Sequence, residues 1–230
     1  FAVSGAIGGD AGQLYVGEGT LRAGAADGSA GGTLRIGEGL TLQPTAATFG
    51  TMPIEVVYGN ATLAPTVDAT VSQAINVAAL GSVVTVSYDS SLVLSGGMSG
   101  YDFDLVKKGA GTLTLASAVD SSGRGYVTVE SGTLSFGCSQ SFAKLTALPG
   151  TTLDFSSDEP VLLGQTVDLT GVNVTVSKET ADYFTLLTVA EDGFIKGVPE
   201  NTNVCRYRLV EHADGTTSLE AKALRNGAVL

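Results

Sequence analysis

The chain has 230 residues, of which 43% are hydrophobic and only 15% are charged, and its formal net charge is −11. This composition is too apolar for a disordered chain, so the protein is expected to fold. The excess of acidic residues repels phosphate backbones, so nucleic acid is not an expected partner. No apolar run approaches the roughly 18 residues needed to span a bilayer, so no membrane insertion of this segment is expected.

The first part of the chain contains an internal repeat. Residues 12–19 return in similar form as residues 32–39. The apolar positions of this repeat continue further along the chain at Leu34 and Ile36, Ile54 and Val56, and Ile75 and Val77. A fixed period of about 20 residues is typical of repeat architectures, in which each unit packs on its neighbours.

A second apolar series occupies the middle of the chain. Its triplets begin at Leu92, Leu113, Leu134, Leu153 and Val172, at steps close to the same period. Apolar and polar residues alternate within residues 113–115 and 127–129, as in strands with one buried face. Glycine-rich or serine-rich stretches separate the strands and supply residues suited to tight bends.

Two all-β architectures fit strands at this spacing. One is an antiparallel sandwich or barrel, and the other is a parallel β-helix with two or three short strands per coil. The constant period favours the β-helix, because equivalent positions stack on themselves from coil to coil. We therefore expect a solenoid of about 20-residue coils over residues 1–180, with ends that a cap, a partner or further coils must cover.

Residues 104–134 carry a resemblance to a known family. Lys108 precedes a Gly-x-Gly-Thr-Leu turn that begins at Gly109, and a second Gly-Thr-Leu follows at Gly132. This pattern resembles the autotransporter-associated β-strand repeat of bacterial surface proteins. The resemblance implies a right-handed parallel β-helix that forms the exported passenger of a surface protein, often an adhesin or a stalk.

The C-terminal part of the chain leaves the repeat. Residues 183–189 and 194–195 suggest strands, and residues 204–211 and 217–222 flank Asp214-Gly215, a strong hairpin signal. We expect residues 181–230 to form a C-terminal β-hairpin cap that is continuous with the helix. Passenger regions of the resembled family finish in a similar way.

Acidic residues supply the first candidates for chemistry. Asp102 and Asp104 would share one face of a strand, where they could act as paired carboxylates or hold Ca²⁺. Asp154, Asp158 and Glu159 form a second acidic group near a turn. For both groups the favoured interpretation is structural: a solvated strand edge and charged turn residues that keep the protein soluble.

Basic residues and the single histidine supply the other candidates. Lys107, Lys108 and Arg124 could neutralise a uronate carboxylate in a lyase, but the resemblance places Lys108 in a recurrent turn, so a structural role is favoured. His212 lies beside the expected hairpin turn without a Ser or Cys nucleophile motif. No catalytic, cofactor-binding or metal-binding residue is therefore predicted, and no cofactor.

The two cysteines leave one question open. Cys138 and Cys205 fit one disulfide of an exported chain. A bridge requires the cap to fold back by several coils, so two buried free thiols are favoured over it.

The sequence thus predicts a non-enzymatic structural or adhesion segment outside the cell, at the bacterial surface. Its partners would be another surface protein or a glycan, although a chain with no Trp and 7% aromatic residues has few side chains for stacking on sugars. One alternative is a carbohydrate-active β-helix enzyme, with a groove where Asp102, Asp104, Lys107 or Arg124 converge. The other is a subunit of a surface filament or layer that self-associates end to end.

Overall fold

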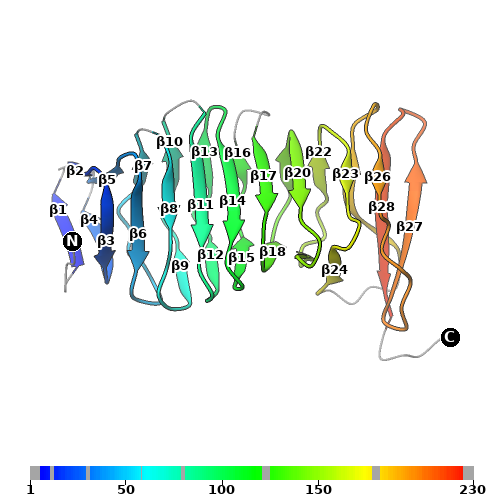
Figure 1. The fold of residues 1–230 in the computed structure, drawn as a ribbon, viewed down its shortest axis with the longest axis horizontal. Coiled ribbons are helices and arrows are strands. Elements are labelled where there is room, and N and C mark those ends of the chain that lie inside the picture. Colours follow the sequence, from blue (N-terminus) through cyan, green and yellow to red (C-terminus); the bar gives the residue numbers. More distant parts are fainter. Residues whose placement is uncertain are drawn as a thin grey trace.

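The computed structural model describes residues 6–10, 13–29, 32–57, 59–78, 81–120, 125–177 and 182–224. Within these residues the protein is all-β, and its parallel sheets stack into a β-solenoid of about seven turns with a spacing of about 21 residues. Figure 1 shows an elongated rod, with β1 (Ala6–Asp10) at one end and the hairpin of β27 (Cys205–Glu211) and β28 (Thr217–Ala223) at the other. None of the described residues belongs to a helix long and apolar enough to cross a bilayer.

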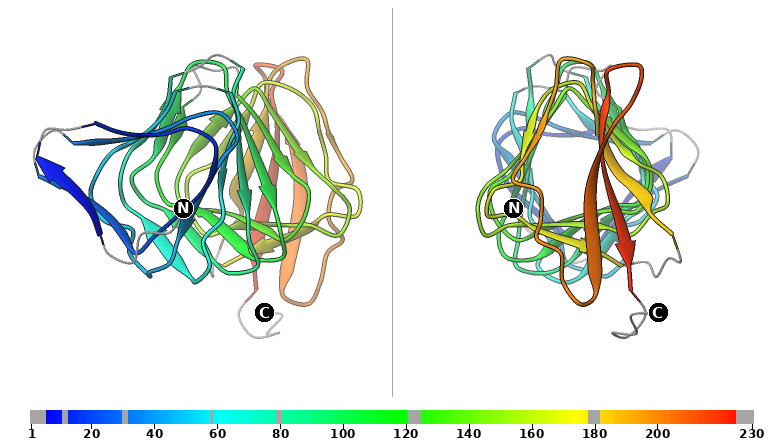
Figure 2. Two further views of the ribbon diagram at one scale, coloured as in Figure 1. Left: turned by 60° about the vertical axis from the view of Figure 1, so that its left-hand side comes forward. Right: turned by 90° about the vertical axis from the view of Figure 1, so that its right-hand side faces the viewer.

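The described coils have three faces, each built from strands that pair in parallel (Figure 2). The first face begins with β2 (Gln13–Val16), β5 (Thr33–Ile36), β7 (Ile54–Val56), β10 (Ile75–Val77), β13 (Met98–Gly100) and β16 (Val119–Asp120). The second contains β3 (Gly19–Ala23), β6 (Leu40–Pro44), β8 (Ala61–Leu63), β11 (Val83–Ser87), β14 (Asp104–Lys108), β17 (Tyr126–Val129) and β20 (Lys144–Ala147). The third contains β9 (Ala69–Val71), β12 (Leu92–Leu94), β15 (Thr112–Leu115), β18 (Thr133–Phe136), β21 (Thr152–Phe155) and β24 (Asn173–Val176).

Near the N-terminal end the third face continues through shorter contacts. There β1 pairs with β4 (Ala25–Ser29), and isolated bridges join Ala26 to Gly50 and Thr48 to Thr70.

The apolar repeats form stacked columns inside the rod, which confirms the predicted solenoid. Leu34, Ile54 and Ile75 are successive Cα partners on the first face. The second series lies on the third face, where Leu92, Leu113, Leu134 and Leu153 are paired in the same way. Both columns are buried, and burial of each such side chain contributes on the order of 1.5–3 kcal/mol.

One member of the second series was predicted wrongly. The sheet pairs Leu153 with Val174 and Phe155 with Val176, so the column continues at Val174 and not at Val172. Val172 lies before β24, where its amide donates to the carbonyl of Leu169. Because Val172 and Val174 have the same parity, alternation alone does not distinguish the two registers.

The C-terminal strands close the rod as the predicted hairpin cap. The first face resumes as β19 (Gln140–Phe142), β22 (Val161–Leu163) and β25 (Phe184–Val189), and β28 and β27 follow in antiparallel order. Gly215 has a φ of 83° in the hairpin turn. The Tyr207 hydroxyl donates to the carbonyl of Val174, 2.8 Å away, and so attaches the hairpin to the last strand of the third face. The predicted boundary between residues 180 and 181 lies outside the described residues.

Candidate functional site

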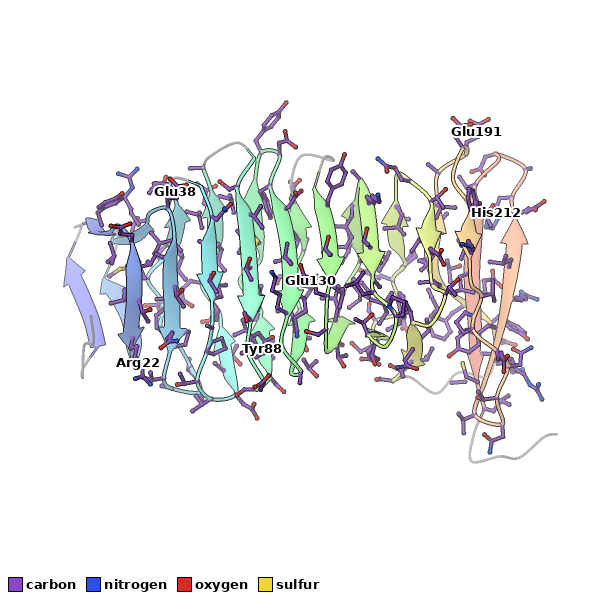
Figure 3. The ribbon with its side chains drawn as sticks, viewed as in Figure 1. Arg22, Glu38, Tyr88, Glu130, Glu191 and His212 are labelled. Carbon is purple, nitrogen blue, oxygen red and sulfur yellow. The ribbon has the colours of Figure 1, made fainter. Side chains whose placement is uncertain are left out.

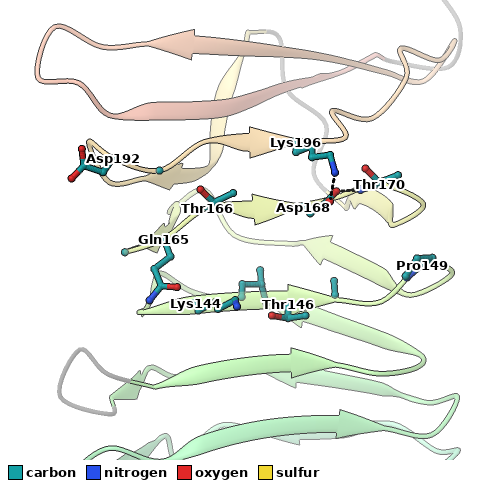
Figure 4. A pocket seen from close by; sticks show the side chains of 13 residues that line it. Lys144, Thr146, Pro149, Gln165, Thr166, Asp168, Thr170, Asp192 and Lys196 are labelled. Atoms are coloured by element: carbon teal, nitrogen blue, oxygen red, sulfur yellow. Dashed lines mark hydrogen bonds and ion pairs between the residues drawn. The ribbon is translucent and has the colours of Figure 1, made fainter.

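A groove interrupts the second face near the C-terminal end of the rod (Figure 4). The long sheet of this face ends at β20, and the next strand, β23 (Val167–Asp168), pairs only with β26 (Ile195–Lys196). In the described part of the chain β20 and β23 are therefore not neighbours in a hydrogen-bonded sheet. The groove between them has a volume of about 830 Å³.

The lengths of three successive corners explain the interruption. Ala143 alone joins β19 to β20, residues 164–166 join β22 to β23, and residues 190–194 join β25 to β26. The strands before these corners stay paired, since β19, β22 and β25 are neighbours in one sheet. The longer corners allow β23 and β26 to begin away from the position that would continue the ladder of β20.

Eight of the thirteen residues that line the groove have polar side chains: Lys144, Thr146, Gln165, Thr166, Asp168, Thr170, Asp192 and Lys196. Asp168 Oδ2 lies 2.9 Å from Lys196 Nζ, and Asp168 Oδ1 accepts a hydrogen bond from the backbone amide of Thr170. Hydrogen bonds from Thr170 and then from Lys196 lower the pKa of Asp168 to about 2. The Thr166 hydroxyl accepts a hydrogen bond from the amide of Phe194, which connects the two sides of the corner.

The groove brings charged and polar groups of both signs together. Two lysines and two aspartates give the lining no net charge. The carboxylate of Asp168 is ionised at neutral pH and can accept hydrogen bonds. The groove therefore offers fixed donors and acceptors to a polar ligand.

Two exposed aromatic residues flank the groove. Tyr126 on β17 is the Cα partner of Lys144 and is 45% exposed. Phe194 precedes β26 and is 59% exposed. It directly follows Gly193, which lines the groove. Neither residue was predicted to belong to a site, although the alternation in residues 126–129 places Tyr126 on the outer face.

Lys107 lies inside the rod, away from the groove. Its side chain is 0% exposed, and its Nζ donates to the carbonyls of Lys108 at 2.8 Å, Gly109 at 2.7 Å and Ser131 at 3.2 Å. The ammonium also lies 5.2 Å from the centre of the Tyr88 ring. Burial lowers its pKa to about 8, and the charge of Asp89 opposes that shift. Lys107 thus fastens two successive corners of the solenoid.

The other basic candidates do not join Lys107. Lys108 points outward and forms a 3.4 Å ion pair with Glu130, both partners being partly exposed. Arg124 lies outside the described residues. A buried lysine bonded to three carbonyls is not available to a substrate, so Lys107 cannot neutralise a uronate from this position, and its contacts fit the structural role that was favoured for it.

The predicted pair Asp102 and Asp104 does not share a strand. Asp102 lies in the corner before β14 with a φ of 56°, and Asp104 begins that strand. Asp104 Oδ1 accepts a hydrogen bond from the amide of Tyr126. The prediction of a common face was wrong because the corner extends through Asp102.

The second acidic group is also distributed differently from the prediction. Asp154 lies within β21, not at a turn, and accepts hydrogen bonds from the hydroxyls of Ser135, Thr175 and Ser177 at 2.7–2.8 Å. Glu159 accepts the amide of Ser139, and Asp158 lies in the same loop. Among the described residues, no group of three or more His, Cys, Asp or Glu side chains is placed to hold a metal ion.

The remaining candidates lie in the walls and the cap. Cys138 and Cys205 are both free thiols, and burial raises the pKa of Cys138. His212, in the hairpin at the C-terminal end (Figure 3), has its Nε2 2.9 Å from Ser218 Oγ. Because Ser218 is buried and also bonded to Thr188, this hydroxyl is not presented to a substrate.

The chain matches no protein-family model, no curated protein and no solved structure.

Proposed function

We propose that this chain is a non-enzymatic structural and adhesion segment of a bacterial surface protein, a rod that presents its outer faces outside the cell. The observation that carries this proposal is the stacked core, in which buried apolar columns run along the rod and a hairpin covers one end. Such a core gives a protein length and stiffness, because each coil packs on its neighbours.

The resemblance of residues 104–134 to the autotransporter-associated repeat supports the surface location. The same segment contains Lys107, Gly109 and Gly132, which stack at one corner of the solenoid. A Cβ on Gly132 would come within 2.5 Å of the Gly109 and Gly111 carbonyl oxygens, so this corner requires glycine. Gly109 and Gly132, two of the glycines that carry the resemblance, thus lie where successive coils contact each other, whereas Lys108 points outward.

The two alternatives receive less support. For the carbohydrate-active enzyme, Lys107 is buried, and Asp102 lies in a corner while Asp104 begins the following strand. For the end-to-end filament, part of the edge of β27 is already occupied, because Asn201 accepts the amide of Tyr207 and the amide of Thr202 donates to Cys205. An edge bonded in this way is a poor template for another chain.

Surface display tests the proposal. The chain would be fused to the membrane barrel of a bacterial autotransporter, with an epitope at its N-terminal end, and intact cells would be treated with protease. We expect the epitope to be surface-exposed and the solenoid to resist cleavage. Retention of the chain inside the cell, or its rapid degradation at the surface, would contradict the proposal.

A further inference from the structure

We infer that the groove between β20 and β23 is a carbohydrate-binding site, which holds a short stretch of glycan through the hydroxyl groups of its sugar rings. The inference rests on the adhesion part of the proposed function and names the class of ligand. It is carried by the lining of the groove, by its size and by the two aromatic residues beside it.

The lining has the mixture of groups that sugars require. A sugar hydroxyl both donates and accepts hydrogen bonds, so it needs acceptors and donors close together. Asp168 and Asp192 supply carboxylate acceptors, Lys144 supplies an ammonium donor, and Thr146 and Gln165 supply both functions. In Figure 4 these side chains come from both strands that border the groove and from the corners before them.

The size and position of the groove fit an oligosaccharide. Its volume of about 830 Å³ falls within the roughly 300–1,000 Å³ of ligand sites. From β17, which carries Tyr126, to β26, beside Phe194, there are three strand intervals, or at least about 14 Å at about 4.8 Å each. That length accommodates more than one sugar ring.

Tyr126 and Phe194 lie next to residues that line the groove: Tyr126 is the strand partner of Lys144, and Phe194 directly follows Gly193. Both are among the most exposed large apolar side chains of the described residues. The apolar faces of sugar rings pack on aromatic rings, while the hydroxyls at their edges remain free for hydrogen bonds. These two rings therefore complement the polar lining beside them.

Two other classes of ligand fit less well. An extended peptide requires apolar pockets for its side chains, but Leu145 and Ala147 in the lining are buried and point into the core. A nucleic acid requires a basic surface, but the lining has no net charge and the whole chain carries −11. A glycan needs neither.

A glycan array incubated with the labelled 230-residue chain tests the inference, with neutral hexose oligosaccharides and uronate oligosaccharides as separate arms. We expect selective binding that falls by about 3- to 10-fold in Tyr126→Ala and in Phe194→Ala. The matched control is Tyr101→Ala, which removes a tyrosine that is 52% exposed in the corner before β14. This control should bind like the unaltered chain.

The two arms also distinguish the kind of sugar. If Lys144→Gln weakens binding to uronates and not to neutral sugars, Lys144 recognises a carboxylate. If Lys144→Gln weakens binding to neither, the hydroxyl contacts suffice. Both results support the site. Binding of no glycan by the folded chain, or equal weakening by Tyr101→Ala, would overturn the inference. Surface display of the same variants is measured separately. A chain that is displayed at the surface but binds no glycan would overturn the glycan site and leave the proposed surface rod standing.

Discussion

Replacement of Lys107 by methionine tests whether a buried ammonium fastens the corners of the solenoid. Methionine keeps the length and the apolar stem but removes the three hydrogen bonds to the carbonyls of Lys108, Gly109 and Ser131. Hydrogen bonds from a charged group contribute about 1.5–3 kcal/mol each, or about 4.5–9 kcal/mol together. Burial of the charge opposes this gain by about 3 kcal/mol, which corresponds to the lowering of the pKa from 10.5 to about 8. We therefore expect Lys107→Met to lower the free energy of unfolding by about 1.5–6 kcal/mol at neutral pH.

Urea unfolding followed by far-ultraviolet circular dichroism measures this loss, and the neighbouring lysine is the matched control. Lys108 points outward, and its ion pair with Glu130 is partly exposed, so Lys108→Met should cost no more than about 1 kcal/mol. The reasoning is refuted if the two variants lose equal stability. Amide hydrogen exchange provides a local readout, because only Lys107→Met should accelerate exchange in the corners at residues 108–111 and 130–132.

Three further perturbations have expected outcomes. The unfolded chain keeps the Lys107 proton up to about pH 10.5, whereas the folded chain releases it above about pH 8, so unfolding takes up a proton between these pH values. The free energy of unfolding of the unaltered chain, relative to that of Lys107→Met, should therefore rise with pH in this interval. A fall would contradict the direction of the pKa shift. Gly111→Ala should destabilise by several times more than Gly24→Ala, as measured by thermal unfolding, because a Cβ on Gly111 collides with the Ser90 carbonyl whereas one on Gly24 meets only Thr45 Oγ1, in ordinary contact at 3.9 Å. Tyr207→Phe should lower the unfolding free energy by about 1–2 kcal/mol, since it leaves a carbonyl of the third face unpaired, and an unchanged urea midpoint would show that this bond does not hold the cap.

The solenoid was predictable because one physical rule generates it repeatedly. Leu113 and Leu115 alternate with threonines and recur one coil later as Leu134 and Phe136, so the strand and its stacking are both visible in the sequence. Lys107 is two positions after the inward Leu105, so alternation along β14 places it on the inner face. A charged residue on an apolar column is unfavourable without partners, so its burial depends on groups that satisfy the ammonium. Its partners are backbone carbonyls, which no side-chain pattern reveals.

The groove could not be predicted from the sequence because it depends on differences between corners. In the sequence, residues 164–166 look like other polar corners. They displace β23 from the ladder of β20 because β22 pairs with β19, whereas β20 follows a corner made by Ala143 alone. Tyr126 and Phe194 are distant in the sequence and come to lie next to the lining of one groove through stacking. Strand pairing therefore decides the site, whereas composition and alternation decide the fold.

Engineered disulfides between neighbouring coils test the stacked winding most directly. In a chain with Cys138→Ala and Cys205→Ala, paired cysteines would replace Thr62 and Thr85, which are Cα partners on adjacent strands of the second face. Adjacent strands lie about 4.8 Å apart, within the Cα separation that a disulfide requires. We predict rapid crosslinking of Thr62→Cys with Thr85→Cys, and none of Thr62→Cys with Val93→Cys on the third face, as read by mass spectrometry of the digested protein. Crosslinking of the second pair but not the first would contradict the solenoid and every proposal built on it.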